Sequence, residues 1–211
     1  MLKNTSHTTI FPLLYLPNID YFILLINNKT PIFLEKYENF QKQTYRNRTR
    51  IMSASGIQNL IIPVDKGSTM QKPYREVRIS YHQNWQKLHL NALKTCYHKT
   101  AFFEFYIADI IPFYEKKWTF LFDYNAEFLL LLLKLLHIDT PLHFTETWQP
   151  INDTEQDYRT CLHPKKASII TEFKPYFQTF EDRLGFQQNL SILDLLFSCG
   201  ADSLLYLKKY Q

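Results

Sequence analysis

Hydrophobic residues near the beginning of the chain form two short extended runs separated by a helical run. Residues 8–15 are rich in β-branched and aromatic side chains, and residues 31–34 begin a second run of this kind. Between them, Asn18 stands where a helix over residues 21–26 would begin, and Asp20 falls in its first turn. Strand, helix and strand at this spacing predict a βαβ unit and a partly parallel sheet.

Asn18 and Asp20 follow directly after the first predicted strand. Ligands of parallel sheets often bind beyond the carboxyl ends of the strands, so these two side chains are candidates for substrate binding. Both residue types are also common at helix N-termini. The sequence therefore leaves a binding role and a capping role open.

A second pattern of alternation occupies residues 43–51, where Arg46, Arg48 and Arg50 take every second position. Successive side chains of a strand point to opposite faces, so the three arginines are expected to fan out on one side. A turn of hairpin type follows, and residues 57–64 predict the returning strand.

Apolar residues then recur with helical spacing over residues 84–137. The first of the three predicted helices has an apolar stripe that contains Trp85 and His89. Residues 102–111 and 119–136 predict the other two helices.

The last third of the chain combines extended and irregular segments. Residues 141–146 and 168–180 predict strands, whereas the polar residues 148–166 predict a surface loop or lid. Ser191 and Asp194 have the spacing of a capping box for a final helix.

Together these patterns predict an α/β fold: a single domain over residues 1–211, with a mixed β-sheet, a β-hairpin insertion and packed helices. The helical block at 84–137 is either part of this domain or a subdomain.

The amino-acid composition argues against several common kinds of binding site. The chain has only 4 glycines in 211 residues and contains neither of the glycine-rich phosphate loops of dinucleotide and nucleoside-triphosphate sites. Cys96, Cys161 and Cys199 are widely spaced, which predicts reduced thiols in a cytoplasmic protein. The histidines lack metal-ligand spacing, so we expect no metal site, and the sequence identifies no cofactor. No apolar run is long enough for a membrane span.

The charge of the chain is concentrated around the arginines. No acidic residue occurs between Glu38 and Asp65, and Lys42 lies in this interval with the three arginines. These four cations equal the net charge of +4, since the remaining 20 basic and 20 acidic residues cancel. Planar guanidinium groups suit phosphate or carboxylate. The alternative is a solvated basic strand that protects a sheet edge.

Arginines that bind a ligand would have no folding partner, so their replacement should leave the stability of the free protein nearly unchanged. A net charge of +4 is too small to require nucleic acid, and most aromatic residues fall in apolar helices, so nucleic-acid binding is a minor alternative.

His89 lies one helical turn after Trp85. Imidazole can act as an acid, a base or an anion ligand near neutral pH. A histidine on an apolar helix face is also commonly hydrogen-bonded in the core. The sequence leaves both roles open.

Four segments together resemble the WbqC-like protein family. They are Pro-Asn-Ile-Asp-Tyr-Phe at 17–22, Tyr-Arg-Asn-Arg at 45–48, Trp-Gln-Lys-Leu-His at 85–89, and Asn-Leu-Ser-Ile at 189–192 with Gly-Ala-Asp at 200–202. The resemblance extends from about residue 10 to residue 207. Leu16 stands where the family usually has Gln.

The resemblance implies a bacterial cytoplasmic protein related to the biosynthesis of O-antigen and other surface polysaccharides, with acyl or aminoacyl (glycyl) transfer as the implied reaction. The expected substrate is a small anionic or nucleotide-activated compound. Arg46 and Arg48 would hold its phosphate or carboxylate, Asn47 would orient it, and His89 would be the general acid or base. Further candidate binding residues are Asn18, Asp20, Lys42, Tyr45 and Trp85. A non-catalytic binding or assembly protein that uses the same basic face is the alternative.

Overall fold

The predicted βαβ unit is present at the beginning of the fold. The computed structural model describes residues 8–65, 72–148, 150 and 156–210. Strand β1 (Thr9–Phe11) leads into helix α1 (Ile19–Asn27) and then into strand β2 (Ile32–Leu34), which pairs with β1 in parallel. Leu13 and Phe22 are among the fully buried side chains of this unit, so the segment after β1 enters the core directly.

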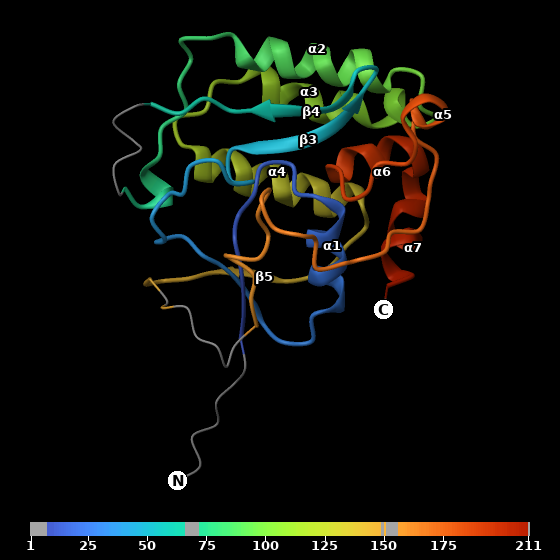
Figure 1. Ribbon diagram of the computed structural model, residues 1–211. Coiled ribbons are helices and arrows are strands. Elements are labelled where there is room, and N and C mark those ends of the chain that lie inside the picture. Colours follow the sequence, from blue (N-terminus) through green and yellow to red (C-terminus); the bar gives the residue numbers. More distant parts are fainter. Residues whose placement is uncertain (1–7, 66–71, 149, 151–155, 211) are drawn as a thin grey trace.

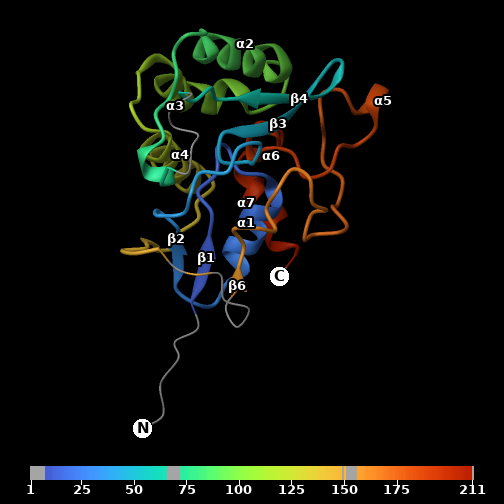
Figure 2. The ribbon, with the colours of Figure 1, turned by 60° about the vertical axis from the view of Figure 1, so that its left-hand side comes forward.

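Two further strands complete a parallel sheet with the order β5-β2-β1-β6. Strand β5 (Leu142–Phe144) pairs with β2, and β6 (Gln156–Asp157) pairs with β1. Figure 2 shows β2, β1 and β6 side by side, with α1 alongside them. The predicted strand at 141–146 is therefore confirmed, and a strand lies within the region for which the sequence predicts a loop. The carboxyl ends of β2 and β6 lead into Glu35 and Tyr158.

The arginine hairpin forms a separate two-stranded sheet. Strands β3 (Arg48–Ser53) and β4 (Gly56–Ile61) are antiparallel and are joined by a tight turn, with Gly56 at a φ of 109°. This conformation is rare for residues with a side chain, which explains the glycine. The α/β fold is confirmed, with the parallel and antiparallel strands in different sheets.

Helices lie on both sides of the hairpin, and α1 lies beside the parallel sheet (Figure 1). The helix predicted at 102–111 extends past Pro112, since α3 continues to Glu115. The predicted strand at 168–180 is wrong: this segment has no regular structure and runs along the surface of the fold. The helical elements are α2 (Trp85–Tyr97), α3 (Phe103–Glu115), α4 (Leu121–Leu135), α5 (Glu181–Leu184), α6 (Ile192–Cys199) and α7 (Ser203–Lys208), with short 3-10 turns at Tyr74–Glu76 and Gly200–Asp202.

One hydrophobic cluster connects the helical block to the parallel sheet. Leu93 of α2, Ile110 of α3 and Leu132 of α4 belong to the same cluster as Phe11 of β1 and Phe22 of α1. In the part of the chain that the structure describes, no helix has both the length and the apolarity that crossing a bilayer requires.

The final long helix begins as predicted but without the expected capping box. Ser191 is the N-cap of α6, and its side chain accepts a hydrogen bond from the backbone of Leu193. The Asp194 carboxylate does not reach back to the N-cap. It accepts hydrogen bonds from the hydroxyl of Tyr97 at 2.7 Å, the hydroxyl of Tyr176, and the amide of Gln178 at 2.9 Å. Asp194 therefore joins α2 and the irregular 168–180 segment to α6.

Asp194 makes a pH-dependent contribution to stability. Burial raises the pKa of its carboxyl above the ordinary value. The unfolded chain therefore loses this proton at a lower pH than the folded chain, so the contribution of Asp194 to stability falls as the pH rises between the two pKa values. We expect wild type to lose unfolding free energy relative to Asp194→Asn as the pH rises above about 4. Urea denaturation at a series of pH values measures this difference, and a difference that stays constant would contradict the expectation.

Candidate anion-binding site

Arg46 is a structural ion-pair partner and does not belong to an exposed arginine fan. Strand β3 begins at Arg48, so Arg46 lies in the turn before it. The Arg46 side chain is 0% exposed, and its Nε and Nη2 donate to the two carboxylate oxygens of Glu38, each at 2.6 Å. The expectation that this arginine has no folding partner is wrong. Sequence spacing suggested a free cation because Glu38 lies just outside the interval that lacks acidic residues.

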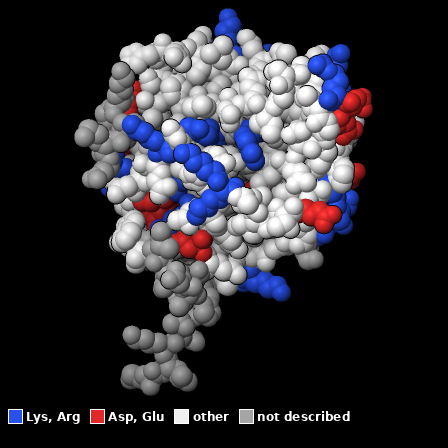
Figure 3. Space-filling view, in the orientation of Figure 1, with Lys and Arg blue, Asp and Glu red and all other residues white. Residues whose placement is uncertain are grey.

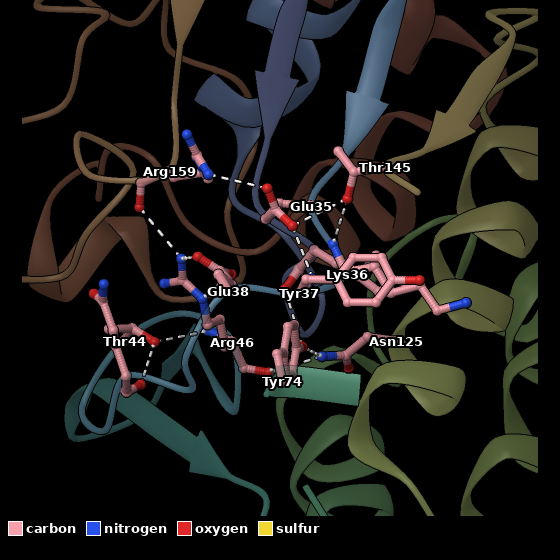
Figure 4. A network of polar contacts seen from close by, with 12 residues as sticks. Glu35, Lys36, Tyr37, Glu38, Thr44, Arg46, Tyr74, Asn125, Thr145 and Arg159 are labelled. Atoms are coloured by element: carbon pink, nitrogen blue, oxygen red, sulfur yellow. Dashed lines mark hydrogen bonds and ion pairs between the residues drawn. The ribbon is translucent and has the colours of Figure 1, made fainter. Parts of the chain in front are cut away.

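The Arg46–Glu38 pair is part of a buried ionic network at the ends of the parallel strands (Figure 4). Arg46 Nη2 also approaches the carbonyl oxygen of Arg159, and Arg159 Nη1 donates to Glu35 at 3.0 Å. Asp157 at the end of β6 binds the same Arg159 guanidinium. The ion pairs of this network hold together the segments that follow β2 and β6. The network therefore supports the loop that leads into the hairpin.

Arg48 and Arg50 are the two arginines that share a face of β3. Both are partly exposed, whereas Thr49 between them is buried and donates to the carbonyl of Leu16 at 2.8 Å. Arg50 Nη2 donates to the carbonyl of Asn189 at 3.2 Å, and its guanidinium lies 5.8 Å from the centre of the Tyr45 ring. These contacts hold Arg50 at the wall of a cavity.

The cavity beside Arg50, called here the Arg50 cavity, has a volume of about 270 Å³. It lies between the hairpin, the α1 N-terminus and the segment after β6. Its lining consists of Asp20, Tyr45, Arg50, Cys161, His163, Lys166, Ala167, Ser168, Phe173, Gln188 and Asn189.

Several positive charges surround this cavity. Burial lowers the pKa of His163, and the charges of Lys165, Lys166, Arg46 and Arg48 lower it further, so all four cations are close enough to act on the imidazole. Figure 3 shows Lys and Arg side chains gathered on the face that carries β3 and the segment after β6. A cavity within such a group of cations concentrates anions, because its walls focus the positive potential.

One part of the cavity wall is a polar junction between two segments that are distant in the sequence. Asn18 occupies the N-cap position of α1, but its side chain makes no capping bond and instead donates to the carbonyl of Asn189 at 2.8 Å. The backbone of Asp20 donates to Asn189 Oδ1 at 3.0 Å, and Asn189 Nδ2 donates to Asp20 Oδ2 at 2.7 Å. Asn189 and Leu16 both have positive φ, at 53° and 43°. Backbone strain of this kind concentrates at functional sites.

Asp20 is the one acidic side chain in the lining of the Arg50 cavity. Burial raises the pKa of its carboxyl, and hydrogen bonds from Asn189, Ser168 and the Tyr21 backbone oppose this effect, as does the charge of Arg50. A simple anion-binding role for Asp20 is disfavoured, because a carboxylate repels an anion. Its place in the lining instead suits an acid or base beside a bound anionic group.

His89 and Trp85 lie in the core, where His89 contacts Tyr15. The Tyr15 hydroxyl lies 2.9 Å from His89 Nδ1. The Trp85 and His89 rings pack edge to face at 5.2 Å, and both residues are at most 5% exposed. His89 does not line the Arg50 cavity, and its role as an acid or base stays a prediction. Its contacts position Tyr15, which precedes the strained Leu16.

The remaining predicted site residues divide between the core, the surface and the cavity. Asn47 is buried, and its side chain donates to the carbonyl of Ile62 at 2.9 Å. Lys42 is exposed and does not line the cavity. Tyr45 does line it, 6% exposed. The structure thus brings Asp20 and Tyr45 to the Arg50 cavity, with Asn18 bonded to its wall.

The sequence did not predict the cavity residues that come from the segment after β6. His163, Lys166 and Ser168 come from segments predicted to be a loop or an edge strand, and no local motif distinguishes them. Asn189 belongs to a recognised segment but gave no functional signal of its own. Arg50 belongs to the arginine alternation. Its position two residues after Arg48 could have identified it as a candidate binding residue.

The chain belongs to the WbqC-like protein family, whose model matches residues 14–171. This range covers the segments at 17–22, 45–48 and 85–89, whereas Asn189 lies beyond it. The chain is also similar to "Uncharacterized protein Rv1507c" of Mycobacterium tuberculosis (strain ATCC 25618 / H37Rv). The two are 28% identical over 223 residues, which cover 92% of this chain and 94% of that protein. No solved structure matches the chain.

The Arg46–Glu38 pair predicts a large loss of stability on truncation. Arg46→Ala would leave the Glu38 carboxylate, 5% exposed, without its bidentate partner. We expect a loss of about 3–5 kcal/mol in the free energy of unfolding, measured by urea denaturation. Arg48→Ala is the matched control and should change stability by no more than about 0.5 kcal/mol, because Arg48 is partly exposed. Equal effects of the two substitutions would contradict the structural assignment of Arg46.

The buried imidazole predicts a second pH dependence, of opposite sign to that of Asp194. Burial lowers the pKa of His89 from 6.5 to about 4. Between these values the unfolded chain binds more protons, so stability falls as the pH decreases. Relative to His89→Gln, wild type should lose about 3 kcal/mol between pH 7 and pH 4. If the free energies of unfolding of the two proteins changed equally with pH, the prediction that burial lowers the pKa of His89 would be wrong.

Proposed function

We propose that this protein is a transferase of bacterial surface-polysaccharide biosynthesis that binds an anionic or nucleotide-activated substrate in the Arg50 cavity. The reaction class rests on the resemblance to the WbqC-like family, for which acyl or aminoacyl transfer is the implied chemistry. One observation supports this location of the site. Segments 17–22, 45–48 and 189–192, far apart in the sequence, each contribute a residue to one cavity beside several cations.

In this proposal, Arg50 and Lys166 bind the phosphate or carboxylate of the substrate. Arg50 is held by Asn189 and by the Tyr45 ring, so its guanidinium is already oriented before a ligand arrives. Orientation in advance lowers the entropy lost on binding. Arg48 and Lys165 do not line the cavity, but their charges act on His163 and increase the local positive potential. Arg46 supports the site from below through the ionic network and does not contact the substrate.

The alternative is a non-catalytic binding or assembly protein that uses the same basic face. It is favoured by a specific observation: Arg46, Asn47, Trp85 and His89, four of the residues expected at an active site, are buried in structural contacts. Both functions require the Arg50 cavity to bind an anion. They differ in whether bound substrate is converted, so turnover discriminates between them.

Thermal unfolding with inorganic phosphate and with a uridine-diphosphate sugar tests the site. A compound at 100-fold excess over its Kd stabilises the folded state by about 2.7 kcal/mol, which is roughly 5–10 °C for a chain of this size. We expect at least one of the two compounds to raise the Tm of wild type and Arg50→Ala to lose the shift. Arg183→Ala removes an exposed arginine outside the Arg50 cavity and should keep it. An equal shift in both variants would place the anion elsewhere.

Deletion of the gene in its source bacterium tests the reaction class. The transferase proposal expects the surface polysaccharide to lose an acyl or aminoacyl substituent, which mass spectrometry of the purified glycan detects. Wild type should restore the substituent and Arg50→Ala should not, whereas Arg183→Ala should. An unchanged glycan in the deletion strain, together with an intact ligand shift, would favour the non-catalytic alternative.

A further inference from the structure

Ser168 and Asp20 form a hydroxyl–carboxylate pair in the lining of the Arg50 cavity. The Ser168 hydroxyl donates to Asp20 Oδ2 at 2.9 Å. The serine is partly exposed at the cavity wall, whereas the aspartate is 5% exposed. An accessible hydroxyl that is hydrogen-bonded to a shielded carboxylate has the geometry of a nucleophile next to its base.

The Asp20 carboxylate is itself held in place by further donors. Asn189 Nδ2 donates to Oδ2 at 2.7 Å, and the backbone of Tyr21 donates to Oδ1 at 2.8 Å. Asn189 in turn is fixed by bonds to Asn18 and to the Asp20 backbone. The arrangement is therefore a hydroxyl, a base and a group that orients the base, which is the general pattern of an activated nucleophile.

The cations of the same cavity complete a site for acyl transfer. Arg50 and Lys166 line it together with Ser168. Their charges suit the phosphate of an activated acyl donor and the negative charge that develops on the carbonyl oxygen during attack. Burial also raises the pKa of the Asp20 carboxyl, which makes it a better proton acceptor than an exposed aspartate.

We propose that Ser168 is a catalytic nucleophile that takes an acyl group from a phosphate-bearing carrier, with Asp20 as its general base and Asn189 as a positioning residue. The inference rests on the proposed transferase function and adds to it a covalent intermediate, an ester between the acyl group and Ser168.

The reaction proceeds in two balanced steps. In the first, Ser168 Oγ forms a bond to the carbonyl carbon, the bond from this carbon to the carrier breaks, and the serine proton passes to Asp20 and then to the carrier. In the second, the oxygen or nitrogen of an acceptor hydroxyl or amine forms a bond to the carbonyl carbon of the ester, and the bond from this carbon to Ser168 Oγ breaks. The acceptor proton passes to Asp20, which gives a proton to Ser168 Oγ. No electrons are gained or lost.

Acetyl phosphate and a fluorophosphonate are the probes for this intermediate. Mass spectrometry of the intact protein and of its peptides should detect one acetyl group on Ser168. In the denatured protein this group should be removed by hydroxylamine at alkaline pH and resist it at neutral pH, as expected for an oxygen ester and not for a thioester. The fluorophosphonate should attach to the same residue. Ser168→Ala should lose both labels, while Ser55→Ala, which removes an exposed hydroxyl in the hairpin turn, should keep them.

Two further variants sharpen the test. Asp20→Asn should slow labelling by about 10²–10⁴-fold, the usual contribution of a general base. Cys161 also lines the cavity, but burial raises its pKa and thereby reduces the reactive thiolate, so Cys161→Ala should label at the wild-type rate. Acetyl transfer that disappears in Cys161→Ala would overturn the assignment of Ser168.

Folding defects and failed chemistry are separated by additional measurements. Ser168→Ala removes a partly exposed hydroxyl and should retain the Tm shift with phosphate or the uridine-diphosphate sugar. Ser168→Cys should trap the acyl group as a thioester, which tests the nucleophile position even if Asp20→Asn does not fold. A wild type that gives the Tm shift but no label on Ser168 from either probe overturns the nucleophile and leaves the anion site standing. The absence of the shift counts against the proposed function itself.

Discussion

The hydrogen bonds between Asn189 and the loop after β1 are the constraint on which the candidate site depends. They join positions about 170 residues apart, and both partners are almost fully buried. Buried amide and carboxylate groups are costly unless they are paired, so each segment fixes the other in place. Because Asp20, Arg50 and Ser168 all bond within this junction or to it, one set of polar contacts determines the shape of the cavity.

The buried ionic network stabilises the fold, whereas the Arg50 cavity is the candidate binding site. At the ends of the parallel strands, Arg46 pairs with Glu38, and Arg159 pairs with both Glu35 and Asp157. All five side chains are shielded from solvent. Bidentate pairs of this kind hold geometry rigidly but leave little capacity for a ligand. The arginines of one short segment are thus divided: Arg46 supports the scaffold, while Arg48 and Arg50 remain available to the basic face.

His89 illustrates the same division between support and chemistry. A histidine near neutral pH is often a catalytic group, and the Trp85 and His89 pair is part of the family resemblance. In the fold, however, its imidazole is enclosed by aromatic rings and bonded to Tyr15, whose backbone continues into Leu16 and the loop before α1. The contacts of His89 therefore support the chain before α1, and its role as an acid or base remains a prediction.

The sequence by itself determined the local architecture: the βαβ unit, the hairpin, the three central helices and the Ser191 cap all follow from periodicity and residue preference. These signals are local, since a strand or helix depends on neighbours within a few positions. It also pointed to Asp20, Tyr45 and the arginine segment. Only the tertiary structure decided which charges were free, because Glu38 neutralises Arg46 through a loop whose path no local pattern specifies. It likewise decided that Ser168, Lys166 and Asn189 meet Asp20, since that cavity forms where an irregular segment folds back over the hairpin, and irregular segments leave no periodic signal in the sequence.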